Sequence, residues 1–180
     1  MKQKISEQLE IPNGISCEFS NNILKCKKDS SELTKKIDVP GMSLSIKDNK
    51  IFIECESGNK KDFKKIKSYV AHIKNLFYGL QKEYIYRLES CNVHFPMTLK
   101  IDGDNVVITN FLGEKTPRFA KILPGVKVEI KGQKITVSSP NKEAAGHTAS
   151  NLERATKIKN RDRRIFQDGI FIVERPGGAK

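Results

Sequence analysis

The strongest chemical signal in the sequence is a cluster of cationic side chains near the C-terminus. Residues 157–164 include a single acid, Asp162. Arginine presents a planar fork of N–H groups that matches phosphate oxygens, and it also stacks on planar rings. Clustered arginines near a glycine-containing turn therefore favour contact with an RNA backbone. The cluster comprises Lys157, Lys159, Arg161, Arg163 and Arg164, with Arg175 further along the chain.

Side chains suited to catalysis are scattered along the chain. A nucleophilic or acid–base site needs a Ser, Cys or carboxylate held beside a base, but His72, His94 and His147 lie apart in unlike contexts. The GxxxxGK[ST] and GxGxxG fingerprints of nucleotide enzymes do not occur. Asp102 and Asp104 flank a glycine, where they suit a tight turn. We therefore expect no enzymatic activity, no cofactor and no small-molecule substrate.

Cys17 and Cys26 are expected to face each other across a hairpin, where they could form a disulfide or half of a metal site. A zinc site takes about four ligands, and no second Cys or His pair has ligand spacing. Buried apolar cysteines and no metal are therefore predicted. The four cysteines form no CxxC pair and there is no N-x-Ser/Thr sequon, which favours a reducing, cytoplasmic compartment.

The elements that position these residues follow from an internal repeat. The segment VPGMSLSIK at 39–47 reappears as LPGVKVEIK at 123–131, an offset of 84 residues. The same offset relates 50–53 to 134–137. We infer two copies of one unit of about 85 residues. The predicted division is 1–89 for the first unit, 90–175 for the second, main RNA-binding unit, and 176–180 for a basic flexible tail.

Each unit reads as hairpins followed by one helix and a last strand. In the first unit a turn at Asn21-Asn22 joins two alternating segments, and residues 84–86 are expected to close the unit as a strand. Apolar side chains over 63–80 recur at intervals of three and four, which predicts an amphipathic helix capped by Asn59. In the second unit a helix is expected from about Asn141, with small side chains that bring it close to its support.

The outer face of the first predicted helix is rich in lysine. This face is most simply a solvated surface, and phosphate contact is the alternative. His147 in the second helix is likewise open to two interpretations, a phosphate contact or a solvent-facing side chain. The lysines are Lys60, Lys61, Lys64, Lys65, Lys67 and Lys74.

Overall charge points to an anionic partner. The chain has 180 residues, 33 Lys and Arg against 21 Asp and Glu, and a net charge of +12. Six of its seven arginines lie in the second half, so we expect that half to bind nucleic acid. No run approaches the roughly 18 apolar residues of a membrane helix, and the N-terminus leads into polar sequence, so neither membrane association nor secretion is expected.

Several motifs of the second half occur together in a familiar order. They are NFLGEK at 110–115, PGV at 124–126, SPNKEAAGHTA at 139–149, TKI at 156–158, RDR at 161–163 and FQDGI at 166–170. Together they resemble the large-subunit ribosomal protein family that is numbered six in bacteria and nine in the eukaryotic cytosol, in its archaeal and eukaryotic branch.

This resemblance implies an α+β fold of two tandem duplicated domains, each a small, mostly antiparallel sheet packed by one helix. It implies a structural, non-catalytic role in the cytoplasmic large ribosomal subunit, beside neighbouring ribosomal proteins. The second domain would bind large-subunit rRNA near the sarcin-ricin loop and the factor-binding region. The implied contacts are Lys142, His147, Asn151, Lys157, Lys159, Arg161, Arg163, Arg164, Arg175 and Lys180.

Two other functions fit the same composition. A free-standing double-stranded-RNA-binding or ribosome-assembly protein would have similar charge, and it would leave mature ribosomes after a moderate salt wash. A protein-interaction scaffold would purify with little RNA and would expose an apolar patch.

Overall fold

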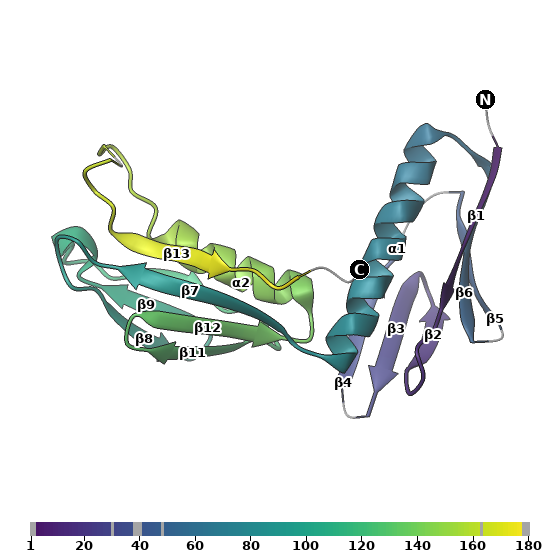
Figure 1. The fold of residues 1–180 in the computed structure, drawn as a ribbon, viewed down its shortest axis with the longest axis horizontal. Helices are drawn as coiled ribbons and strands as arrows, with labels where there is room; N and C mark the ends of the chain where they lie inside the picture. The colour runs from purple at the N-terminus through teal and green to yellow at the C-terminus, as the bar shows by residue number, and fades with distance from the viewer. Residues whose placement is uncertain (1–2, 30, 38–40, 48, 163, 178–180) are drawn as a thin grey trace. The chain divides into compact units, whose positions relative to one another are not determined.

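The computed structural model describes residues 3–29, 31–37, 41–47, 49–162 and 164–177. The chain divides between Lys82 and Glu83 into two compact units, here called unit 1 and unit 2 (Figure 1). Each unit combines antiparallel sheets with one long helix. The predicted α+β class with two related units is therefore confirmed.

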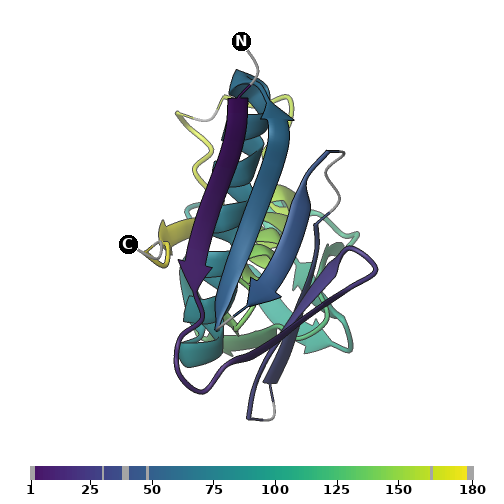
Figure 2. The ribbon, with the colours of Figure 1, turned by 90° about the vertical axis from the view of Figure 1, so that its right-hand side faces the viewer.

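Unit 1 is built from two three-stranded antiparallel sheets and one helix. The sheets have the strand orders β1-β6-β5 and β2-β3-β4. Figure 2 shows β1, in purple, and β6, in blue, lying in front of the helix α1. The elements are β1 (Gln3–Glu10), β2 (Ser16–Ser20), β3 (Ile23–Lys28), β4 (Ser31–Lys36), β5 (Ser43–Lys47), β6 (Lys50–Gly58) and α1 (Lys60–Gln81).

The local signals of unit 1 are confirmed. Asn21 and Asn22 adopt positive φ angles of 50° and 61°, which a two-residue turn of the hairpin requires. The side chain of Asn59 accepts hydrogen bonds from the N–H groups of Lys61 and Asp62, and Asp62 accepts one from the Asn59 N–H. This reciprocal capping fixes the start of α1. Of the predicted apolar stripe, only the first residue, Phe63, is exposed.

Unit 2 contains a four-stranded sheet, a three-stranded sheet and one helix. The sheets have the orders β11-β12-β7-β13 and β10-β9-β8. The helix α2 packs on β7, β12 and β13 and also on β10 (Figure 1). The elements are β7 (Tyr84–Cys91), β8 (Thr98–Asp102), β9 (Asn105–Thr109), the 3-10 turn η1 (Phe111–Gly113), β10 (Arg118–Lys121), β11 (Lys127–Lys131), β12 (Lys134–Ser139), α2 (Lys142–Ala155) and β13 (Gly169–Glu174).

The strand β7 belongs to unit 2. It pairs antiparallel with β12 on one side and with β13 on the other. The expected boundary at residue 89 therefore lies inside a strand, and residues 84–86 do not close unit 1. The local pattern predicted the strand correctly, but the partners that decide its sheet are more than 40 residues away.

The helix α2 lies close to β7 because its inner face is made of small side chains. Ala145 and Ala149 are fully buried. A Cβ atom on Gly146 would lie 2.9 Å from the Oη atom of Tyr86 on β7, and a Gly146 substituent would therefore press on that ring. The close approach expected from the small side chains of this helix is confirmed.

Candidate nucleic-acid interface

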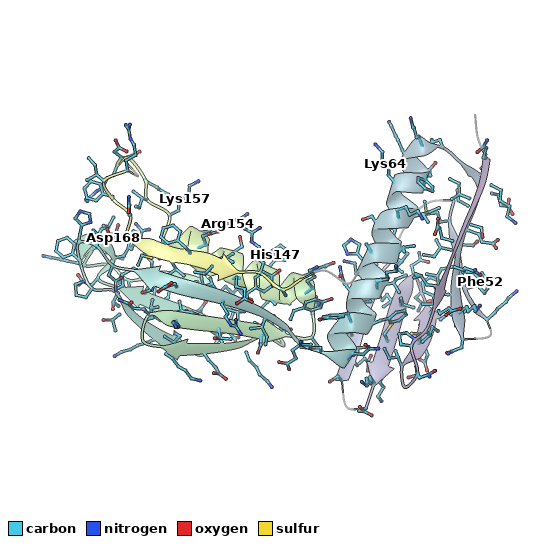
Figure 3. All side chains as sticks on the ribbon, in the orientation of Figure 1. Phe52, Lys64, His147, Arg154, Lys157 and Asp168 are labelled. Atoms are coloured by element: carbon cyan, nitrogen blue, oxygen red, sulfur yellow. The ribbon has the colours of Figure 1, made fainter. Side chains whose placement is uncertain are left out.

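The candidate interface is the segment between α2 and β13, residues 156–168, here called the basic loop. Lys157, Lys159, Arg161 and Arg164 are all exposed on it, and Arg175 is exposed just after β13. Figure 3 shows His147, Arg154 and Lys157 following one another along one edge of unit 2. The predicted sites Arg163 and Lys180 lie outside the described residues.

The basic loop ends at a buried anchor, Asp168. Its side chain has no exposed surface. Oδ1 accepts hydrogen bonds from the backbone N–H groups of Val93 and His94 at 2.8 and 2.9 Å, and Oδ2 lies 2.6 Å from Nδ1 of His94. The carboxylate thus joins the end of the loop to the segment after β7.

The pKa of Asp168 reflects two opposing causes. Burial raises the pKa, but the hydrogen bonds from the backbone and ring of His94 and from the backbone of Val93 lower it further than burial raises it. The pKa of Asp168 therefore lies below its ordinary value of 3.8. Asp168 is therefore ionised at neutral pH, and its charge is held by donors of its own unit.

A column of side chains connects this anchor to Arg161. The His94 ring stacks on Phe166 with a centroid separation of 4.9 Å. The guanidinium carbon of Arg161 lies 4.8 Å from the Phe166 ring centroid. A cation over an aromatic ring is held by the ring quadrupole, while its outer N–H groups stay available. We call Asp168, His94, Phe166 and Arg161 the anchoring column.

Arg164 lies in a different setting from Arg161. Its guanidinium contacts both carboxylate oxygens of Asp162 at 3.1 and 3.2 Å, and its backbone N–H donates to the same carboxylate. The Arg164 side chain, followed by its backbone N–H, lowers the pKa of Asp162. Arg164 therefore stabilises the loop's turn and offers less uncompensated charge than Arg161.

Three predicted contacts lie on α2 itself. Lys142 is the first residue of the helix, with its Nζ 5.5 Å from the centroid of the Tyr84 ring. His147 is exposed. Asn151 has a structural role as well, because its side-chain amide donates to the Lys121 carbonyl of β10 at 2.9 Å.

Sequence reasoning missed the contribution of Arg118. Its guanidinium forms two contacts with Glu114, at 2.6 and 2.8 Å, and donates to the carbonyl of Ala155 at 2.8 Å. It also lies 4.2 Å from the Phe111 ring centroid. Hydrogen bonding to Arg118 is the largest cause of a lowered pKa at Glu114. Arg118 thus secures the C-terminal end of α2, where the basic loop begins.

A cavity of about 800 Å³ lies against the basic loop. Its lining is mainly apolar and includes Ile158, Ile170 and Phe171, while Arg154 and Lys157 also border it. This side of unit 2 therefore offers cationic groups and apolar surface together.

Other kinds of site find no support in the part of the chain that the structure describes. Those residues contain no group of three or more His, Cys, Asp or Glu side chains that could hold a metal ion. Within the same ranges, neither helix is both long enough and apolar enough to cross a membrane.

Comparison with known proteins identifies the family. The family model described as Ribosomal protein L6 matches residues 95–169. Three archaeal proteins with the name large ribosomal subunit protein uL6 match nearly the whole chain. The one from Methanococcus vannielii is 40% identical over 173 residues, 96% of this chain and 95% of the relative.

The other two relatives agree with it. The protein from Methanosarcina mazei is 38% identical over 175 residues, 97% of this chain and 99% of the relative. The protein from Methanobrevibacter smithii is 40% identical over 171 residues, 95% of this chain and 96% of the relative. With this identity over nearly the full length, the chain belongs to the uL6 family of large ribosomal subunit proteins.

Proposed function

We propose that this chain is a structural, non-catalytic constituent of the cytoplasmic large ribosomal subunit, and that it binds large-subunit rRNA through the basic loop. Family membership supports the subunit assignment. The single observation that supports RNA binding by the basic loop is the anchoring column. It holds the exposed Arg161 guanidinium over the Phe166 ring, which in turn stacks on His94. A pre-positioned cation loses less side-chain entropy when it binds phosphate.

The loop binds RNA by phosphate contact on a rigid support. The side chains of Lys157, Lys159 and Arg161 form no direct ion pair among the described residues, although the charge of Arg161 also acts on the Glu114 carboxylate. Their N–H groups can therefore contact phosphates. Each phosphate that is neutralised releases counterions, and affinity falls as salt rises. If about six phosphates are contacted, log K against log salt has a slope of about −4 to −5. A slope near zero would contradict phosphate binding.

Unit 1 makes fewer rRNA contacts in this proposal. Two of its α1 lysines are ion-paired, Lys65 with Asp62 at 3.6 Å and Lys67 with Glu7 at 2.7 Å. The unit also contains no arginine. Its lysine face serves chiefly as a solvated surface.

The finer location that we propose is rRNA close to the sarcin-ricin loop and the factor-binding region. Its support is the resemblance of the motifs at 110–170 to the family. A Lys159→Cys variant in which the partly exposed Cys17 and Cys91 are changed to alanine, with iron-EDTA tethered at position 159, tests this location, because the tether cleaves RNA near its attachment point. Cleavage within the sarcin-ricin loop region is expected. Cleavage confined to distant rRNA helices would refute the location without affecting family membership.

Neighbouring ribosomal proteins are the second class of partner in the proposal. Unit 2 exposes large apolar side chains to solvent, including Phe119 and Val173, whose exposed fractions are 61% and 66%. Such residues suit coverage by neighbouring ribosomal proteins.

Sedimentation separates this role from the alternative, a free-standing double-stranded-RNA-binding or ribosome-assembly protein. After a moderate salt wash, a structural constituent remains with mature large subunits and polysomes in stoichiometric amount. An assembly protein is found on immature particles or in the free fraction. The second result would overturn the proposal.

A further inference from the structure

Cys17 and Cys26 lie directly opposite each other in unit 1. They are partners in the antiparallel register of β2 and β3, and their Sγ atoms are 3.3 Å apart. Ser20 and Ile23 flank the two-residue turn, so they form a hydrogen-bonded pair, and such pairs alternate with non-hydrogen-bonded ones along the ladder. Counting back three positions makes Cys17–Cys26 a non-hydrogen-bonded pair.

This register suits a disulfide bond. In a non-hydrogen-bonded pair the Cα atoms are about 4.5 Å apart and the side chains approach closely. Disulfides span Cα separations of roughly 4.4 to 6.8 Å. The two sulfur atoms can therefore bond after a small side-chain movement, with no change in strand register.

The two thiols differ in access and in acidity. Cys26 is fully buried in the core of unit 1, whereas Cys17 is partly exposed on β2. The hydrogen bond between Cys17 and Cys26 lowers the pKa of the Cys17 thiol more than burial raises it. The same hydrogen bond, burial and the Cys17 charge all raise the pKa of Cys26. The more accessible thiol of the pair is thus also the more acidic one.

We propose that Cys17 and Cys26 form a peroxide-reactive pair that closes a reversible cross-strand disulfide. Cys17 is the attacking group and Cys26 the resolving one. The Cys17 thiolate attacks one peroxide oxygen, the O–O bond breaks, and a sulfenic acid and hydroxide result. The Cys26 sulfur then attacks the Cys17 sulfur, the S–O bond breaks, and the Cys26 proton leaves with the hydroxide as water. Peroxide accepts the two electrons, and a dithiol reverses the step.

The remaining cysteines provide internal references. Cys55 is buried on β6 of unit 1, and Cys91 is partly exposed on β7 of unit 2. Neither has another cysteine in hydrogen-bonding contact within the described ranges. Cys91 therefore tests whether exposure alone explains reactivity. The described residues also contain no group of three or more His, Cys, Asp or Glu side chains that could hold a metal ion, which favours a disulfide at Cys17 and Cys26 over a metal site.

The test treats the reduced full-length protein with a small excess of hydrogen peroxide, blocks remaining thiols with an alkylating reagent, and maps peptides by mass spectrometry. We expect a Cys17–Cys26 linked peptide lighter by two hydrogen atoms, and full recovery of both thiols with dithiothreitol. Loss of these thiols should be at least about ten-fold faster than loss of the Cys91 thiol, because thiolate character governs the rate. Equal rates, no reaction, or links between molecules would overturn the proposal.

Two variants separate the roles within the pair. In Cys26→Ala, dimedone should trap a sulfenic acid at Cys17, because the resolving thiol is missing. In Cys17→Ala, Cys26 should remain unmodified under the same peroxide exposure. Accumulation of sulfenic acid at Cys17 in the unsubstituted protein, without a linked peptide, would contradict the resolving role of Cys26. The unsubstituted protein decides the question if either variant folds poorly.

Discussion

Asp168 is the residue on which the geometry of the basic loop depends. Its buried carboxylate takes three hydrogen-bond contacts from Val93 and His94. Asp168→Asn replaces the oxygen that meets the His94 ring by an amide and removes the charge. We expect a loss of about 2 kcal/mol in the free energy of unfolding of unit 2, since hydrogen bonds to a buried charge are worth about 1.5–3 kcal/mol.

The stabilisation that the Asp168 carboxylate provides depends on pH. The pKa of Asp168 is below 3.8 in the folded protein, so its stabilisation is complete well above pH 3.8 and is lost as pH falls through the lower folded value. The gap in stability between the unsubstituted protein and Asp168→Asn should therefore close in acid. This gap is measured by urea unfolding, monitored through the NMR signals of unit 2. A gap that is the same at pH 7 and in strong acid would contradict the ionised anchor.

Phe166 tests whether the column positions Arg161. Phe166→Leu leaves every charge in place but removes the ring below the guanidinium. We expect RNA affinity to fall about two- to five-fold, because an exposed cation–π contact is worth about 0.5–1 kcal/mol. The slope of log K against log salt should stay unchanged, since the number of cations is the same.

The matched control is Phe119→Leu on β10, which removes an exposed ring that is outside the ring and cation contacts of the anchoring column. It should leave RNA affinity unaltered. If both leucine variants bind RNA like the unsubstituted protein, Phe166 has only a packing role.

At the scale of elements, the close approach of α2 to β7 produces a measurable coupling. Gly146→Ala gains helix propensity of up to about 1 kcal/mol, but the new Cβ would lie 2.9 Å from the Tyr86 hydroxyl. Tyr86→Phe removes that oxygen. We therefore expect Gly146→Ala to be more stabilising in the Tyr86→Phe background than in the unsubstituted protein, by about 1 kcal/mol.

A double-mutant cycle on urea unfolding measures this coupling. Ser150→Ala, one turn further along α2, is the control, because it should change stability equally in both backgrounds. Additive effects for Gly146 and Tyr86 would mean that the tyrosine ring moves away without cost.

Local signals explain which elements were predictable. Asn21-Asn22 and Asn59 act on neighbours within a few residues, so the turn and the helix start followed from the sequence. The repeat offset likewise indicated two related units. The assignment of β7 to unit 2 was not predictable, because strand partners are set by the competition between whole sheets rather than by local pattern.

Only part of the candidate interface could likewise be predicted from the sequence. The cations of the basic loop were evident from their types and spacing. The anchoring column was not, because its contacts join residues 74 positions apart in the chain. The contact from Arg118 to Ala155 spans 37 positions and was missed for the same reason. Asp162 was noted as an acid within the cluster, but its pairing with Arg164 became clear only from the geometry.

At the scale of the whole molecule, similar net charges serve two different purposes. Residues 1–90 have 17 basic and 12 acidic side chains, and residues 91–180 have 16 and 9. In unit 1 a group of lysines lies on α1, where Lys65 and Lys67 are ion-paired. In unit 2 a group of cations lies on the basic loop, which is held at the buried Asp168 carboxylate. In our proposal, placement rather than total charge therefore decides which unit binds RNA.

The most direct test compares two variants with equal loss of charge. Lys157, Lys159 and Arg161 of the basic loop are changed together to alanine in one, and Lys60, Lys61 and Lys64 of α1 in the other. Binding to large-subunit rRNA is measured against salt. The loop variant should bind about 30- to 100-fold more weakly near 0.15 M salt, with a slope reduced by about 2–3, because three phosphate contacts are lost. The α1 variant should stay close to the unsubstituted protein. Equal losses in both, or a larger loss in the α1 variant, would contradict the assignment of RNA binding to the basic loop.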